Sequence, residues 1–296
     1  MITVHSIQEL RDALRRMKLE HRRPDGDPTI GFVPTMGYLH NGHASLLSKA
    51  RSQCDIVVLS IFVNPIQFGP NEDYEKYPRD EERDLAVAKK HGADIVFMPT
   101  PDMMYPTPTK TKVHVDDITS PLCGATRPVH FDGVTTVVTK LFHLVQPDQA
   151  FFGMKDAQQV AVIQRMVEDL NFPVEIVPCP IVREADGLAM SSRNVYLSEE
   201  ERAQALILSR SLRQVDDWLE ENPQLTAPML QQKMKDMIAQ QPLADIDYVE
   251  VLSFPDLEPL ASEMPIDQRS TNILIALAVK FGRTRLIDNR MLTHGE

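Results

Sequence analysis

A continuous apolar run most restricts the folds open to this chain. The segment DIVVLSIFV, residues 55–63, shows no alternation of polar and apolar side chains. Such a run of Val, Ile and Leu is typical of a strand in a parallel sheet that is covered on both faces. The run therefore predicts an α/β architecture with helices on both sides of the sheet.

Strand and helix patterns alternate on either side of this run. Further strands are predicted at residues 29–34, 94–99, 149–153 and 174–180, and helices at residues 43–53, 81–92, 134–145 and 156–170. An amphipathic helix is predicted near the N-terminus, where Ser6 and Glu9 have capping-box spacing. Repeated strand–helix units predict a doubly wound parallel sheet, whose ligands bind beyond the carboxyl ends of the strands. We therefore expect the motif-bearing loops to gather at one edge.

The pattern changes after Val182. The loop READGLAMSSRN, residues 183–194, leads into a long predicted helix that begins at residue 198 with a second capping box, Ser198 and Glu201. A helix at residues 227–238 and strand-like segments at residues 246–252, 272–281 and 284–289 follow. This order predicts two domains, residues 1–184 with the doubly wound sheet and residues 185–296 as a smaller α+β domain.

Composition narrows the functional classes. The 296 residues are 43% hydrophobic and carry a formal net charge of -11, which suits a globular protein and disfavours general binding to nucleic acid or to an anionic membrane surface. We expect neither a membrane span nor a signal peptide. The three cysteines are far apart and form no CxxC motif, as expected for reduced thiols in the cytoplasm.

The segment PTMGYLHNGHASLL, residues 34–47, joins a predicted strand to a predicted helix. If the helix begins near His43, the glycines allow a tight turn and Gly42 leaves the helix N-terminus open to an anion. His40 and His43 would then donate hydrogen bonds or positive charge to phosphate. The alternative is a capped helix with two surface histidines, which composition alone favours equally. A metal site is less favoured, because no matching ligand set lies nearby.

Polar side chains also follow two other predicted strands. Asn64 and Gln67 come after the apolar run and suit the hydroxyls and carboxylates of a small substrate. The acidic loop after them is either a lid or, as we favour from this segment alone, an ordinary surface loop. In FFGMKDAQQV, Lys155 offers a charge for phosphate and Asp156 an acceptor for ribose, with Gln159 one turn further on. Asp156 could instead simply cap the helix.

A fourth candidate lies in the interdomain loop. Ser191, Ser192 and Arg193 combine two hydroxyls with a guanidinium, which can bind phosphate oxygens as a bidentate fork. Such a tripeptide is common when taken alone. It gains weight because all four candidates fall at predicted strand ends or in the interdomain loop.

The four motifs together, TMGYLHNGH, FVNPIQF, GMKDAQQ and READGLAMSSRN, closely resemble those of the pantoate–β-alanine ligases, and the resemblance covers nearly the whole chain. The His-x-Gly-His element alone also resembles nucleotidyltransferases and class I aminoacyl-tRNA synthetases. The resemblance implies a Rossmann-like sheet and condensation of pantoate with β-alanine through a pantoyl adenylate, with ATP converted to AMP and pyrophosphate. It also implies Mg²⁺, a homodimer, and a second domain that closes over the site.

Residue roles follow from the same resemblance. His43 and His40 would contact the triphosphate, and with Lys155 and Arg193 they form the expected catalytic set. Gln67, Gln159 and Asn64 would bind pantoate and β-alanine, and Asp84 is a weak candidate for the surroundings of Mg²⁺. The expected ATP site comprises Met36, Gly37, Tyr38, Leu39, His40, Asn41, Gly42, His43, Gly153, Met154, Lys155, Asp156, Val182, Met190, Ser191, Ser192 and Arg193.

Met154 departs from the family pattern, which has Glu at this position, whereas Lys155 and Asp156 are retained. Two other functions compete with the ligase. A nucleotidyltransferase would share the His-x-Gly-His loop but should lack the paired glutamines and the Ser-Ser-Arg loop in these contexts. A noncatalytic nucleotide-binding protein would bind ATP without turnover and would not need Lys155.

Overall fold

The computed structural model describes residues 1–24, 26–70 and 72–294. The chain divides into two compact units. The first comprises Met1–Met154 and Val162–Pro180, and the second comprises Lys155–Ala161 and Ile181–Glu296. The expected domain boundary at residue 184 stays a prediction.

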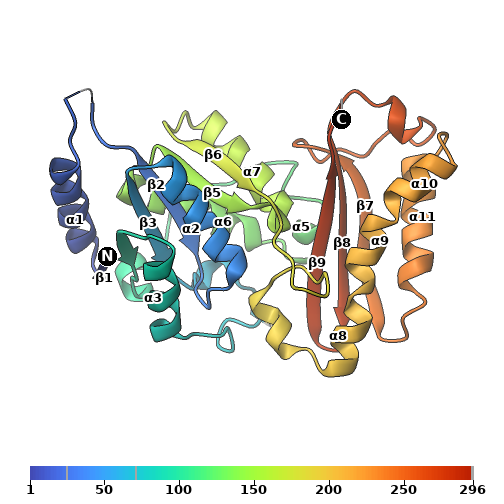
Figure 1. The fold of residues 1–296 in the computed structure, drawn as a ribbon, viewed down its shortest axis with the longest axis horizontal. Helices are drawn as coiled ribbons and strands as arrows, with labels where there is room; N and C mark the ends of the chain where they lie inside the picture. The colour runs from blue at the N-terminus through green and yellow to red at the C-terminus, as the bar shows by residue number, and fades with distance from the viewer. Residues whose placement is uncertain (25, 71, 295–296) are drawn as a thin grey trace. The chain divides into compact units, whose positions relative to one another are not determined.

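A six-stranded parallel sheet forms the centre of the first unit (Figure 1). Its strands are β1 (Ile2–Val4), β2 (Ile30–Thr35), β3 (Ile56–Ile61), β4 (Ile95–Phe97), β5 (Gln149–Gly153) and β6 (Glu175–Cys179). The order is β1-β4-β3-β2-β5-β6, so the chain winds outward in both directions from β2. The doubly wound sheet is therefore confirmed. The edge strand β1 was not predicted, because three residues are too few to show a period.

Helices cover both faces of this sheet. They are α1 (Ile7–Glu20), α2 (Asn41–Gln53), α3 (Glu81–Lys90) and α6 (His130–Val145), with the short α4 (Pro101–Met104) and α5 (Cys123–Thr126) in connections. Val33 of β2 belongs to one core cluster with residues of α2 and α3. The next side chain along, Phe32, meets Phe142 of α6 edge-on with 6.3 Å between ring centroids. Adjacent residues of β2 thus face opposite helix layers, which explains why apolar runs fill the central strands.

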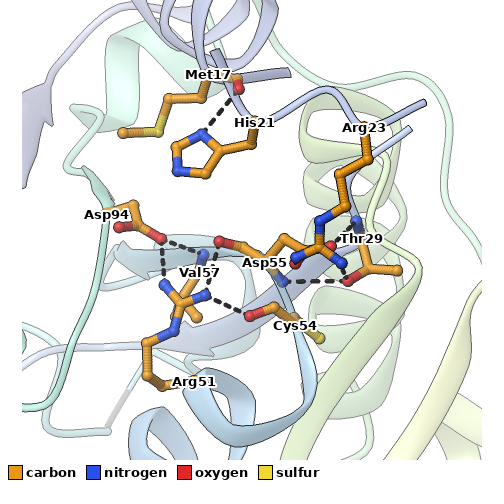
Figure 2. A network of polar contacts seen from close by, with 9 residues as sticks. All are labelled: Met17, His21, Arg23, Thr29, Arg51, Cys54, Asp55, Val57 and Asp94. Carbon is orange, nitrogen blue, oxygen red and sulfur yellow. Dashed lines mark hydrogen bonds and ion pairs between the residues drawn. The ribbon is translucent and has the colours of Figure 1, made fainter. Parts of the chain in front are cut away.

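Ion pairs and backbone contacts gather where β2, β3 and β4 begin (Figure 2). The Arg51 guanidinium donates to Asp94 Oδ2 at 2.7 Å, to the Asp55 carbonyl at 2.6 Å and to the Cys54 carbonyl. Asp55 in turn pairs with Arg23, and its other oxygen accepts the Thr29 N–H at 3.0 Å. This network joins the amino ends of three strands without occupying their carboxyl ends.

The second unit contains an antiparallel sheet of β7 (Ala244–Ser253), β8 (Ile273–Phe281) and β9 (Thr284–Leu292) in that order. Its helices are α8 (Glu199–Ala205), α9 (Ile207–Arg213), α10 (Val215–Glu221) and α11 (Ala227–Ile238), and α7 (Ala157–Asp169) starts within this unit. A buried cluster that includes Leu208, Leu230 and Leu277 joins the helices to the sheet. The expected α+β arrangement is thus observed in this part of the chain.

The long helix predicted from residue 198 is wrong in one respect, because α8, α9 and α10 are separate helices. The single residues between them, Leu206 and Gln214, have ψ angles of -16° and -12°. Such values lie nearer the tighter 3₁₀ geometry than the α-helix, although the Leu206 and Gln214 carbonyls still accept from the N–H groups of Arg210 and Trp218, four residues on. Both predicted capping boxes, at Ser6 and Ser198, are present. None of the helices in the described ranges is both long and apolar enough to cross a bilayer.

Candidate active site

The turn after β2 carries the first group of predicted site residues. Gly37 has a φ of +87° and Tyr38 a φ of +51°, so two consecutive residues use the left-handed region to reverse the chain. The helix α2 then begins at Asn41, two residues before the predicted start, because His40 is its N-cap. The backbone N–H of Gly42 donates to His40 Nδ1 at 3.1 Å. A histidine thus performs the capping usually done by Ser, Thr, Asp or Asn.

The two histidines form a reciprocal cap. The backbone N–H of His40 donates to His43 Nδ1 at 3.3 Å, and the ring centroids lie 4.1 Å apart at an interplanar angle of 33°. An imidazole nitrogen that accepts a hydrogen bond carries no proton, so the proton of each neutral ring is assigned to Nε2. Both rings therefore have an Nε2–H donor beside the N-terminus of α2, which suits an anionic oxygen.

Asp84 of α3 holds the same turn in place. Its side chain is buried, and its two oxygens accept the backbone N–H groups of Tyr38 at 2.8 Å and Leu39 at 2.6 Å. Burial raises the pKa of Asp84, and these two hydrogen bonds partly oppose the rise. Asp84 therefore fixes the turn through both of its oxygens. Its expected place in the surroundings of Mg²⁺ stays a prediction.

Asn64 and Gln67 lie together beyond β3, around the 3₁₀ turn η1 (Pro65–Gln67). Both side chains are buried, and Asn64 Nδ2 donates to Gln67 Oε1 at 3.0 Å. Gln67 Nε2 approaches Met36 Sδ at 3.2 Å, which links this pair to the turn after β2. The expectation that loops at the carboxyl ends of β2 and β3 meet is confirmed for these three residues.

Further side chains, which were not predicted, fix η1. Arg127 makes a two-point ion pair with Glu72, with Arg127 Nε 2.9 Å from Glu72 Oε1. Burial alone would raise the pKa of Glu72, but the Arg127 guanidinium lowers it below its ordinary value. His130 Nδ1 lies 3.0 Å from the Gln67 carbonyl. These contacts hold Glu72 and Gln67, and the choice between a lid and a surface loop for the acidic segment stays a prediction.

The Lys155 motif spans the change of unit, with Gly153 and Met154 in the first unit and Lys155 and Asp156 in the second. Gly153 is the last residue of β5, and Met154, Lys155 and Asp156 form the 3₁₀ turn η2 (Met154–Asp156) before α7 begins at Ala157. Lys155 Nζ lies 3.8 Å from Asp156 Oδ2, and the Lys155 carbonyl accepts from Asn289 Nδ2 at 2.9 Å. Gln159 is half-buried in the first turn of α7. The backbone of this motif is therefore tied to β9.

Residues 182–194 form a loop in the second unit that hydrogen bonds and an ion pair hold in place. The Met190 N–H donates to the Val182 carbonyl at 3.0 Å, and Arg183 makes a two-point ion pair with the buried Asp288 at 2.6 and 2.9 Å. Ser191 Oγ accepts the backbone N–H of Arg193 at 3.2 Å and caps the turn η3 (Ser192–Tyr196). The backbone of the Ser-Ser-Arg motif therefore makes its contacts within its own unit.

Tyr105 is a site neighbour that the sequence did not reveal. Its hydroxyl donates to Asn64 Oδ1 at 2.8 Å across 41 positions of sequence. It lies in a Pro-rich connection without any period, so no local pattern indicates this contact. Only the fold of the sheet and its loops brings the two residues together.

Comparison with known proteins agrees with this geometry. The family model for pantoate-beta-alanine ligase matches residues 2–291. The pantothenate synthetase of Caldicellulosiruptor saccharolyticus is 54% identical over 98% of this chain and 98% of its own, and that of Pelotomaculum thermopropionicum is 53% identical over 99% of each.

Solved structures agree as well. The crystal structure of the pantothenate synthetase from Thermus thermophilus has a TM-score of 0.87 at 44% identity, covering 98% of this chain and 99% of its own. The Francisella tularensis pantoate-beta-alanine ligase, solved with beta-gamma ATP and beta-alanine, has a TM-score of 0.77 at 32% identity over 98% and 97%. The chain belongs to the pantoate-beta-alanine ligase family.

Proposed function

We propose that this protein joins pantoate to β-alanine at the expense of ATP and releases pantothenate, AMP and pyrophosphate. The observation that carries the proposal is that the Nδ1 atoms of His40 and His43 both accept backbone N–H groups, which assigns the proton of each neutral ring to Nε2 beside the N-terminus of α2. Family membership identifies the acid and the amine. A carboxylate is a poor electrophile at neutral pH, so the reaction requires activation by a nucleotide.

In the first step a pantoate carboxylate oxygen attacks the α-phosphorus of ATP. A new P–O bond forms, the bond from the α-phosphorus to the bridging oxygen of the β-phosphate breaks, and pyrophosphate leaves with the electron pair. Negative charge grows on the departing phosphate oxygens. Donors that are already aligned lower the barrier most, because they need no reorganisation when the charge appears. The Nε2–H groups of His43 and His40 meet that requirement, with His43 as the principal donor.

In the second step the amine of β-alanine attacks the carbonyl carbon of the pantoyl adenylate. The C–N bond forms, the acyl C–O bond breaks, AMP leaves with the electron pair, and the amine nitrogen releases its proton to solvent. The adenylate must be shielded from water until the amine arrives. The buried amides Asn64 and Gln67 suit this task, because they can hold polar substrate groups in a region with little access to solvent.

The other roles follow the family pattern. Gln159 is proposed to bind pantoate with Gln67, which also borders the β-alanine site, and Val182 to meet adenine through its backbone. Lys155 and Arg193 are the proposed cationic partners of the phosphates, and Asp156 the ribose acceptor. The remaining proposed ATP contacts are Met36, Gly37, Tyr38, Leu39, Asn41, Gly42, Gly153, Met154, Met190, Ser191 and Ser192.

Magnesium is proposed to accompany ATP, since Mg²⁺ commonly binds through nucleotide phosphates and few protein groups. Within residues 1–24, 26–70 and 72–294 no group of three or more His, Cys, Asp or Glu side chains could hold a metal ion. Asp84 keeps its proposed place in the surroundings of Mg²⁺, because a carboxylate oxygen that accepts one hydrogen bond still has a further lone pair. We also propose a cytoplasmic homodimer, which light scattering tests by giving twice the 33.5 kDa chain mass.

The deciding experiment incubates the protein with ATP, magnesium and pantoate, with and without β-alanine. We expect pantoate-dependent release of pyrophosphate, and formation of AMP and pantothenate only when β-alanine is present. A folded protein that releases no pyrophosphate with pantoate would reject the ligase function. Stable transfer of AMP to a phosphorylated acceptor would instead indicate a nucleotidyltransferase, and ATP binding without turnover a noncatalytic protein.

A further inference from the structure

A line of hydrogen bonds reaches Gln67 from a residue outside the family motifs. Tyr105 OH donates to Asn64 Oδ1 at 2.8 Å, and Asn64 Nδ2 lies 3.0 Å from Gln67 Oε1. Gln67 Nε2 is then 3.2 Å from Met36 Sδ. All four residues belong to the first compact unit. The line therefore runs from a Pro-rich connection to the edge of the proposed ATP site.

The direction of this line is determined by a backbone group. Asn64 Nδ2 also lies 3.1 Å from the Gly133 carbonyl oxygen, which can only accept a hydrogen bond. The amide nitrogen of Asn64 must therefore face Gly133, and its oxygen must face Tyr105. A carbonyl oxygen cannot donate, so the phenol hydroxyl must do so. Burial raises the pKa of Tyr105, which keeps the hydroxyl protonated and able to donate.

The orientation of the Gln67 side-chain amide follows from the same reasoning. The second N–H of Asn64 requires an acceptor, so the Gln67 atom that faces it must be Oε1. This leaves Nε2, with two N–H groups, on the other side of the amide. There it meets a thioether sulfur, which is only a weak acceptor. A carboxylate or hydroxyl oxygen is a much better partner for these donors.

The surroundings make this orientation rigid. A Cβ on Gly133 would lie 2.5 Å from Gln67 Cα. The backbones of α6 and η1 are therefore in contact at this point, without side chains between them. The Lys140 ammonium lies 5.2 Å from the centroid of the Tyr105 ring, within the range of a cation–π contact. Phe62 packs against the same ring with 6.2 Å between centroids. The phenol is thus held on two sides, with its hydroxyl directed at Asn64.

We propose that Tyr105 is a positioning residue that, through Asn64, makes Gln67 a hydrogen-bond donor toward substrate. The amide of Gln67 therefore selects acceptor oxygens, such as those of the pantoate carboxylate and hydroxyl groups, over substrates that present donors at the same point. This inference rests on the proposed function for the identity of the substrate. Tyr105 itself acts through Asn64 and Gln67.

The first test is Tyr105→Phe, which removes one oxygen and keeps the ring. Asn64 Oδ1 loses its donor, so only the Gly133 carbonyl still orients the Asn64 amide, and the amides of Asn64 and Gln67 are held less firmly. We expect the KM for pantoate to rise about tenfold while the KM for ATP stays within twofold of wild type. Tyr248→Phe in β7 is the matched control, and it should leave both constants unchanged. A Tyr105→Phe enzyme with the wild-type KM for pantoate overturns the proposal.

A double-mutant cycle separates positioning from a general structural effect. If Tyr105 acts through Gln67, Tyr105→Phe should raise the KM for pantoate no further once Gln67 is Ala. Full additivity of the two changes would overturn the proposal. Gln67→Glu tests the direction of donation, because its outer oxygen cannot donate when ionised. It should weaken pantoate binding more than Gln67→Ala, and equal KM values would contradict the donor assignment.

Wild-type turnover distinguishes failure of the proposed function from failure of the positioning role. If the wild-type protein releases no pyrophosphate with pantoate, the proposed function is wrong and the substrate assignment made for Gln67 falls with it. If wild type is active and Tyr105→Phe leaves the KM for pantoate unchanged, the ligase function stands and only the positioning role is rejected.

Discussion

His43 is the residue whose chemistry depends most on a single local contact. The backbone N–H of His40 bonds to its Nδ1, so a neutral ring must donate through Nε2. Substitution by Ala removes that donor and half of the reciprocal cap. We expect His43→Ala to slow pyrophosphate release about 10²- to 10³-fold, the usual cost of losing one aligned donor to developing charge.

Two further variants make this prediction sharper. His43→Gln can keep an N–H donor near the Nε2 position and should recover part of the rate, whereas His143→Ala, an exposed histidine on α6, should match wild type. Single-turnover kinetics of pyrophosphate release are the measurement. An adenylation rate equal to wild type in folded His43→Ala would show that another group supplies the donor.

Asp84 makes a different prediction, about stability. Its two oxygens accept two backbone N–H groups of a turn with positive φ angles. In Asp84→Asn one of these N–H groups would face an amide NH₂, which cannot accept. We expect the free energy of unfolding to fall by about 1–3 kcal/mol, the cost of an unsatisfied buried polar group.

Glu82→Gln is the control for this change, since it removes the same charge from an exposed position in the same helix. Urea unfolding at neutral pH compares the two variants. An Asp84→Asn protein as stable as Glu82→Gln would mean that the turn does not need a carboxylate.

Some site residues could be predicted from the sequence and others could not. The motif positions that hold polar groups at strand ends, such as Gln67 and His40, could be chosen because strand ends are visible in the pattern. The contacts of Asp84 and Tyr105 could not be predicted, because their partners lie 41 or more positions away in the sequence. A long-range contact leaves no period in the chain, so neither the backbone contacts of Asp84 nor the contact of Tyr105 with Asn64 was predicted.

At the scale of elements, the central strands and their covering helices followed from apolar periodicity. The errors are at boundaries where a side chain or a backbone angle decides the outcome. α2 starts early because His40 caps it, and the helix expected from residue 198 divides at Leu206 and Gln214. Such boundaries depend on single dihedral angles and hydrogen bonds, which the hydrophobic pattern of a sequence does not show.

The contact between α6 and η1 gives a prediction at this scale. Gly133 has its Cβ position 2.5 Å from Gln67 Cα and 2.6 Å from the Ile66 carbonyl oxygen, both backbone atoms. Gly133→Ala must therefore separate the two elements. We expect a loss of stability of about 1–3 kcal/mol from overpacking, together with a higher KM for pantoate.

Gly153→Ala is the control for stability, because a Cβ there meets no atom within 4 Å. Thermal unfolding should show a lower midpoint for Gly133→Ala and a midpoint equal to or above wild type for Gly153→Ala. Equal midpoints for the two variants would show that α6 and η1 can separate without cost.

At the scale of the whole molecule, ligand binding should be visible as stability. ATP that binds only the folded chain stabilises it by about 2.7 kcal/mol at 100 times its dissociation constant. We expect ATP with magnesium to raise the midpoint of thermal unfolding in the wild type and to raise it less in Arg193→Ala. Differential scanning fluorimetry over a range of ATP concentrations measures both. A midpoint that does not depend on ATP would reject nucleotide binding.

The network around Arg51 and Asp94 has a consequence for how such a protein can change over evolutionary time. It ties the strands together at their amino ends, whereas His40, Asn64 and Gln67 follow the opposite, carboxyl ends. Substitutions that change thermal stability at the amino ends of the strands need not change substrate binding at the carboxyl ends. A lineage can therefore adapt its heat tolerance and its substrate preference largely independently, by mutations at opposite ends of the same sheet.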